Sequence, residues 1–206
     1  MTRIAQIVSV VFHPLWMPLY LFLGAWWIDP YMRAFLPLGL LKYLLFVLGI
    51  NVVAPLVSIL MLRYRNLISS LHLRKREERL LPFIIVLAYY ILTYFLLRLK
   101  AVPIPEVVYS MLLCLILVLT AVLIINFWWK ISVHLTAAGG VLGTLIGLST
   151  IHQFDVSFWL YVVLGLAGII AFARLQLREH SSLQVYAGFL LGGSISYWLV
   201  SAQFMI

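Results

Sequence analysis

Of the 206 residues in this chain, 65% are hydrophobic and 10% are charged, and the mean hydropathy is +1.12. Soluble domains are roughly half apolar and about a quarter charged, so this composition excludes an ordinary soluble protein and indicates an integral membrane protein. The 14 Lys and Arg residues outnumber the 6 Asp and Glu residues, which gives a net charge of +8. Because the cations lie at the ends of apolar runs, we expect anionic lipid headgroups or a phosphorylated substrate, and not nucleic acid, as their partners.

Apolar runs bounded by proline, charged or polar residues predict an all-α integral membrane protein, a bundle of about six to seven transmembrane helices. The expected helices are about 5–28, 37–62, 81–99, 105–128, 131–150, 156–173 and 183–204. No linker or low-complexity segment divides the chain, so residues 1–206 should form a single transmembrane domain. The first run has no small-residue cleavage site, and we expect an uncleaved first span rather than a signal peptide.

Prolines interrupt the first two apolar runs. His13-Pro14 and Pro18 should bend the first helix, because proline removes a backbone hydrogen bond. We interpret His13 either as an interhelical hydrogen-bonding group or as a group that contacts a substrate. In the second run, Asn51 and Pro55 predict a polar contact between helices beside a kink.

Small residues recur four apart in two of the later runs. Gly139, Gly143 and Gly147 lie on one face of the helix expected at about 131–150, and Gly188 and Gly192 form a similar face in the last helix. Such rows let helix backbones approach closely. The helix at 131–150 should therefore be central in the bundle.

Three polar segments interrupt the apolar chain, at 74–79, 130–134 and 174–184. Two expected spans separate each segment from the next, so all three should lie on the same side of the bilayer. Guanidinium groups and the amides of a helix start hold phosphate, and a nearby imidazole can attack phosphorus or protonate the leaving oxygen. The residues that can converge in such a basic pocket are Arg79, Ser132, His134, Arg174 and His180.

The second and third segments resemble signatures of the type 2 phosphatidic acid phosphatase superfamily of membrane lipid phosphatases. Against Ser-Arg-x5-His-x3-Asp, the chain reads Ala173-Arg174, five residues, His180, three residues and Gln184. Against Pro-Ser-Gly-His, it reads Ile131-Ser132-Val133-His134. Arg174 and His180 are therefore in register with the one signature, where Ala173 and Gln184 replace Ser and Asp, and Ser132 and His134 are in register with the other, where Ile131 and Val133 replace Pro and Gly.

The first segment matches its signature, Lys-x6-Arg-Pro, least well. Arg79 precedes Pro82 by three residues instead of one, and the position seven before Arg79 is His72, with Lys75 the nearest lysine. The resemblance spans about residues 72–190, and the order and spacing of the segments make the set more specific than each motif alone. The chain resembles a divergent bacterial branch of this superfamily.

The resemblance implies a metal-independent phosphatase that forms a phosphohistidine. It assigns His180 as the nucleophile and His134 as the acid for the departing lipid oxygen. The implied phosphate ligands are Arg79, Arg174 and Ser132. Lys75 would take the lysine role only if its loop differs locally from the family, and Lys130 is an additional cation by proximity alone.

Gln184 stands where the family has the aspartate that orients the nucleophilic imidazole. An amide oxygen can accept a hydrogen bond from the ring, but it contributes no charge. Loss of the corresponding aspartate charge in a serine protease costs about 10⁴ in kcat, so catalysis could be strongly attenuated here. Gln184 also fits a capping box with Ser181 as N-cap, which would begin the last helix.

Other functions compete with the phosphatase. The chain could bind lipid phosphates or act as a membrane scaffold without turnover, and Arg174 and Arg178 would be favourable at a helix end in any case. A small transporter is less favoured, because no inverted repeat is recognisable. Five histidines without a close pair or carboxylate partners predict no metal site, and no cofactor is expected.

Charge does not decide the orientation in the membrane, which we expect to be a bacterial inner membrane. Ten cations fall on the face of the three polar segments and four on the other, which favours a cytoplasmic site. Without the possible site residues, the count becomes three against four. Substrate candidates are phosphatidate, phosphatidylglycerol phosphate, a polyprenyl diphosphate and lipid A phosphate, and the oligomeric state is left open.

Overall fold

The computed structural model describes residues 2–71, 73, 75–99 and 104–202. The chain is 82% helical, and no strand occurs among the described residues. Within these described ranges, six helices are long and apolar enough to span a membrane. They are α4 (Leu38–Tyr64), α5 (Leu80–Leu99, continuing the 3₁₀ turn Glu77–Arg79), α6 (Glu106–Ile125), α7 (Val133–His152), α8 (Ser157–Gln176) and α9 (Ser182–Ser201). The predicted all-α integral membrane bundle is thereby confirmed.

The first apolar run forms two helices, α1 (Thr2–Val11) and α2 (Met17–Ile28), instead of one bent helix. Between them the chain turns at His13-Pro14, where the backbone N–H of Trp16 donates to the carbonyl of His13 at 2.9 Å. Proline cannot donate the bonds that would continue α1, so the helix ends before it. A short helix that the sequence did not predict, α3 (Pro30–Phe35), follows because Asp29 caps it by accepting from the N–H of Tyr31.

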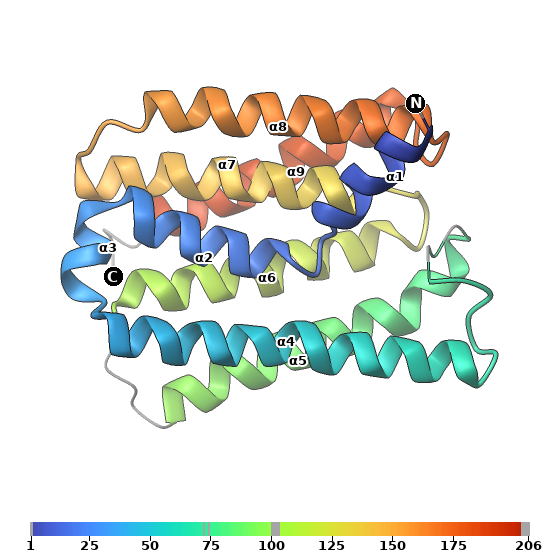
Figure 1. The fold of residues 1–206 in the computed structure, drawn as a ribbon, viewed down its shortest axis with the longest axis horizontal. Coiled ribbons are helices and arrows are strands. Elements are labelled where there is room, and N and C mark those ends of the chain that lie inside the picture. Colours follow the sequence, from blue (N-terminus) through green and yellow to red (C-terminus); the bar gives the residue numbers. More distant parts are fainter. Residues whose placement is uncertain (1, 72, 74, 100–103, 203–206) are drawn as a thin grey trace.

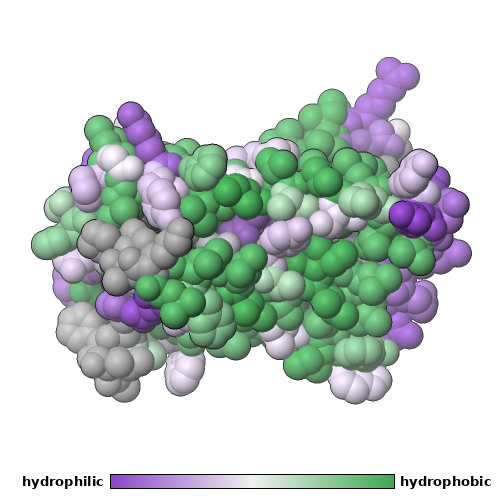
Figure 2. Space-filling view, turned by 90° about the horizontal axis from the view of Figure 1, so that it is seen from below, coloured by the Kyte–Doolittle hydropathy of each residue, from purple (hydrophilic) through white to green (hydrophobic). Residues whose placement is uncertain are grey.

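The helices run along one long axis, and the polar segments meet at one end of it. The starts of α1, α5, α7 and α9 and the ends of α4, α6 and α8 lie together (Figure 1). We call this the basic end, because Arg79, Lys130 and Arg174 lie there. Figure 2 shows hydrophobic side chains around the middle of the molecule and hydrophilic ones towards both ends. The apolar middle matches the hydrocarbon core of a bilayer, so the basic end lies at one membrane surface.

Helix α7 is the most buried of the long helices and packs tightly on α9. A Cβ atom added at Gly192 would lie 1.9 Å from the carbonyl oxygen of Thr136, and one at Gly139 would lie 2.0 Å from that of Phe189. Only glycine leaves room for backbones this close. The glycine rows therefore make α7 central, as predicted.

A polar contact joins α4 to α5 in the middle of the bundle. The side-chain amide of Asn51 donates to the hydroxyl of Thr93 at 2.6 Å, and both side chains are buried. This confirms the interhelical contact expected at Asn51. The α-helix continues through Pro55 to Tyr64.

Candidate active site

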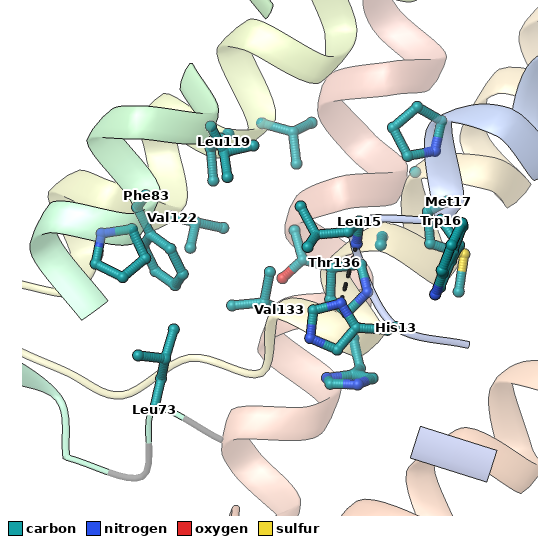
Figure 3. Close-up of a pocket in the computed structure, with 18 of the residues that line it drawn as sticks. His13, Leu15, Trp16, Met17, Leu73, Phe83, Leu119, Val122, Val133 and Thr136 are labelled. Atoms are coloured by element: carbon teal, nitrogen blue, oxygen red, sulfur yellow. Dashed lines mark hydrogen bonds between the residues drawn. The ribbon is translucent and has the colours of Figure 1, made fainter. Parts of the chain in front are cut away.

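A cavity of about 810 Å³ extends from the basic end into the bundle. Figure 3 shows Phe83, Leu119 and Val122 of α5 and α6 on one side of it, and His13 and Leu15 from the segment between α1 and α2 on the other. Most of the lining is apolar. Its polar and charged members near the basic end are Gln6, Ser9, His13, Arg79, His134, Arg174, Glu179 and His180. The structure therefore brings together the two histidines and two arginines that the sequence proposed.

The two arginines that line the cavity are buried. Arg79 is 5% exposed and donates from Nε to the carbonyl of Leu73 at 3.0 Å and from Nη1 to that of Ile131 at 3.3 Å. Arg174 is 8% exposed and donates from Nη1 to the hydroxyl of Ser9 at 3.3 Å, while its Nε has no hydrogen-bond partner. Buried guanidinium groups are costly unless an anion compensates them, and the carboxylate of Glu179 supplies one negative charge near both. Because Arg79, Arg174 and Lys130 together carry three positive charges, this end of the cavity still favours a negatively charged ligand.

His180 lies in the loop between α8 and α9, and Gln184 holds its ring. The Oε1 atom of Gln184 lies 3.0 Å from Nδ1 of His180 and 3.2 Å from the backbone N–H of Ser181. A backbone N–H can only donate, so the amide oxygen faces both groups and Nδ1 of His180 carries a proton. The other ring nitrogen, Nε2, is then left with its lone pair.

The capping box predicted at the start of α9 is also present. The hydroxyl of Ser181 accepts from the N–H of Gln184 at 3.4 Å, and the Gln184 side chain returns the bond to the N–H of Ser181. One amide oxygen thus begins the helix and orients the imidazole. The two interpretations of Gln184 are compatible, because both contacts use the same atom.

His180 is neutral at physiological pH. Burial, and next the positive charges of Arg79 and Arg174, lower the pKa of its imidazole to about 3. The hydrogen bond to Gln184 opposes this shift without reversing it. A neutral ring with a free Nε2 is the form in which histidine acts as a nucleophile.

His134, in the first turn of α7, is 9% exposed, and its Nε2 lies 3.1 Å from the carbonyl oxygen of Ser9. That carbonyl can only accept, so Nε2 carries a proton. The ring of His13 packs edge-on against that of His134, with 5.5 Å between the centroids. Ser9 therefore contacts two site residues at once, His134 through its carbonyl and Arg174 through its hydroxyl.

Ser132 is the N-cap of α7, but its side chain makes no capping hydrogen bond. Its hydroxyl is buried and has no partner, and its backbone N–H donates to the carbonyl of Gln184 at 3.3 Å. This bond joins the starts of α7 and α9, which carry the two motifs. Ser132 does not itself line the cavity, although the next two residues, Val133 and His134, do.

The two lysines proposed as ligands lie apart from the cavity wall. The Nζ atom of Lys130 is 3.7 Å from Oε2 of Glu179, and burial, followed by the charge of Arg79, lowers the pKa of Lys130. The side chain of Lys75 is 70% exposed and lies 3.9 Å from Glu78. The structure thus places Lys75 on the surface, and His72 lies outside the described residues.

Three side chains at the site were not assigned to it from the sequence. Ser9 was missed because a single hydroxyl in an apolar helix has no recognisable pattern. His13 was noted only as one of two alternatives, and Glu179 was passed over although it directly precedes His180. Its position next to His180, within the third polar segment, was the signal that could have identified it.

Among the described residues, no group of three or more His, Cys, Asp or Glu side chains is placed to hold a metal ion. No protein-family model, curated protein or solved structure matches the chain.

Proposed function

We propose that this chain is a membrane phosphatase for lipid phosphates or diphosphates, a divergent relative of the type 2 phosphatidic acid phosphatases in a bacterial inner membrane. The observation that carries the proposal is the cavity, where two buried arginines and two histidines lie at one end of a space with mostly apolar walls. The basic end suits a phosphate at headgroup level, and the apolar walls suit the hydrocarbon part of the same molecule.

In the proposed reaction, the lone pair of Nε2 of His180 attacks phosphorus and the bond from phosphorus to the lipid oxygen breaks. Gln184 accepts from the Nδ1–H and holds the ring in line. His134 takes up a second proton when the phosphate anion binds beside it, and it gives one proton to the departing oxygen. It then takes a proton from the water that hydrolyses the phosphohistidine. Arg79 and Arg174 compensate the charge on the phosphoryl oxygens.

Loss of turnover with retained binding is the second candidate function, and Gln184 is the observation that favours it. An aspartate would stabilise the positive ring that forms when His180 attacks, whereas an amide supplies only a dipole. Such a protein would bind lipid phosphates through Arg79 and Arg174 without releasing phosphate.

The proposal is tested by incubating the purified protein in detergent with a panel of lipid phosphates and diphosphates and measuring the inorganic phosphate that is released. We expect His180→Ala and His134→Ala to reduce release by at least about 10³-fold, because members of one catalytic unit cannot substitute for each other. Arg65→Ala is the control, since it removes an exposed cation at the same end of the bundle. Wild type treated with a radiolabelled lipid phosphate should retain label that His180→Ala does not.

Release that is unaffected in His180→Ala would contradict the phosphohistidine mechanism. No release from any lipid by the wild type, together with saturable binding of a lipid phosphate, would favour the second candidate.

A further inference from the structure

The cavity exists because the hydrophobic core divides near the basic end. One buried cluster there packs around Met17, Leu135 and Ile170, and another around Ile59 and Tyr90. Residues of both clusters line the cavity, so the cavity is the space between them. In the other half of the bundle a single cluster fills the centre. The cavity therefore ends inside the molecule instead of passing through it.

The floor of the cavity lies near the middle of the membrane. Its deepest lining residues on α5, α6 and α9 are Tyr90, Cys114 and Ser196. One or two turns farther from the basic end, the core is closed by side chains with no exposed surface, among them Leu48, Met111, Leu148 and Val200. These fully buried residues close off the lower half of the bundle.

Helix geometry gives the depth of the cavity. Tyr90 follows Arg79 by eleven positions, which at about 1.5 Å per residue corresponds to about 16 Å. The hydrocarbon core of a bilayer is about 30 Å thick, so the cavity is about as deep as one leaflet. An acyl chain of ordinary length spans the same distance from headgroup to midplane.

The side of the cavity reaches the lipid-facing surface. Five lining residues are also exposed: Gln6 on α1, and the apolar residues Val10 and Trp16 near the break between α1 and α2, Leu56 on α4, and Leu71 in the loop after it. The opening lies between the α1–α2 segment and α4. A lipid chain can pass from the bilayer through such an opening without crossing water.

We propose that the cavity holds one acyl-length hydrocarbon chain of the anionic lipid whose phosphate lies at Arg79 and Arg174, and that Tyr90, Cys114 and Ser196 limit the length of that chain. The proposal deepens the proposed function, since it concerns the same site. It narrows the substrate class to lipid phosphates with acyl-length chains and disfavours long polyprenyl phosphates, whose chains would meet the floor.

Selection in this cavity is steric. A chain that moves from lipid or detergent into the cavity gains no hydrophobic free energy, because both surroundings are apolar. A chain longer than the cavity must displace packed side chains, and such overpacking is unfavourable. The dependence of binding on chain length should therefore show a maximum length and a sharp decrease beyond it.

A series of substitutions on α6 tests the limit at three depths. Cys114, Val118 and Val122 all line the cavity and are four residues apart, so they share one helix face at steps of about 6 Å. Phenylalanine at each position fills the cavity from the floor upwards. Leu117→Phe is the matched control, because Leu117 lies on the same helix but faces outwards, 39% exposed, and does not line the cavity.

The probes are saturated alkyl phosphates from octyl to octadecyl, measured by binding to purified protein in detergent. We expect the longest well-bound chain to become shorter in the order Cys114→Phe, Val118→Phe, Val122→Phe, with chains beyond the limit bound at least about tenfold more weakly. Leu117→Phe should leave the limit unchanged. A dodecyl phosphate with a photoreactive terminal carbon should label Tyr90, Cys114 or Ser196 in the wild type.

Two results would overturn the proposal. One is an identical dependence on chain length in the three variants and the wild type, provided that each variant elutes as a folded protein. The other is photolabelling confined to lipid-facing residues such as Leu117. Binding with the expected limits on chain length but without phosphate release would refute the phosphatase and support the chain pocket. Phosphate release without any limit on chain length would support the phosphatase and refute the chain pocket.

Discussion

At the residue scale, one amide carries two functions. Gln184 caps α9 and orients His180 through the same oxygen.

An aspartate at position 184 could accept the hydrogen bond from the ring and also stabilise the positive ring formed during attack. We expect Gln184→Asp to maintain or raise phosphate release, measured on the best lipid substrate. Gln184→Leu is the contrasting variant, because it removes both contacts, and it should reduce release and destabilise the start of α9 by about 1 kcal/mol.

The buried state of His180 predicts how stability depends on pH. Its pKa is about 3 in the folded protein and about 6.5 when unfolded, so between these values the unfolded chain binds a proton that the folded chain does not. The contribution of His180 to stability is therefore present above about pH 6.5 and is lost as the pH falls towards 3.

Thermal unfolding in detergent at about pH 7 and about pH 5 measures this effect. The wild type should lose more stability between the two conditions than His180→Gln, which has no group to titrate at that position. Equal losses in the two proteins would show that the ring is accessible to protons in the folded state.

The sequence predicted part of the site. Arg174, His180 and His134 were assigned from motif spacing, and all three line one cavity. Ser9 could not be assigned, because its position opposite Arg174 depends on the angle between α1 and α2, which the turn at Pro14 sets. The placement of Lys75 on the surface likewise depends on the path of a loop that no periodic pattern describes.

At the scale of elements, the close approach of α7 and α9 positions the site. The starts of these two helices carry His134 and Gln184, and the glycine rows set the distance between them. The spacing of the glycines predicted tight packing. The spacing of the glycines did not predict the orientation of α1 in the bundle, because a proline break and contacts with α8 determine that orientation.

Gly192→Ala tests this packing. The added Cβ would lie 1.9 Å from a backbone oxygen of α7, so the helices must separate and we expect a loss of about 1–3 kcal/mol in stability. Gly168→Ala is the control, because a Cβ there has nothing within 4 Å and should stabilise α8 by up to about 1 kcal/mol. Thermal unfolding in detergent distinguishes them, and equal effects would contradict the role of close approach.

At the scale of the whole molecule, hydropathy predicted the helical spans. The even number of spans between successive polar segments predicted that the three segments lie at the same end of the bundle. Every long apolar run except the first, which divides into α1 and α2, forms one helix within a few residues of its expected bounds, since a span must satisfy its own backbone in lipid. The cavity was not predictable in this way. It results from how two clusters of side chains pack beside each other, and apolar lining residues look the same in the sequence as apolar core residues.

Labelling with an impermeant thiol reagent tests the arrangement of the ends. The chain has a single cysteine, Cys114, which is buried and can be replaced by alanine to give a cysteine-free background. Lys75→Cys and Arg178→Cys should react from the same side of the membrane, and Asp155→Cys from the opposite side. Reaction of the first two from different sides would exclude a common site.

The contact of Ser9 with both Arg174 and His134 has a consequence for how a ligand arrives. An anion that takes the two donors now bound to Ser9, Nη1 of Arg174 and Nε2 of His134, must displace this serine, whereas Nε of Arg174 has no partner and can bind a ligand without any exchange. The exchange replaces two internal hydrogen bonds by two new ones, so its net free energy is small, about 1 kcal/mol for each bond. The amino-terminal helix is thus held at the site by contacts for which a bound phosphate would compete, so we expect ligand binding to loosen α1.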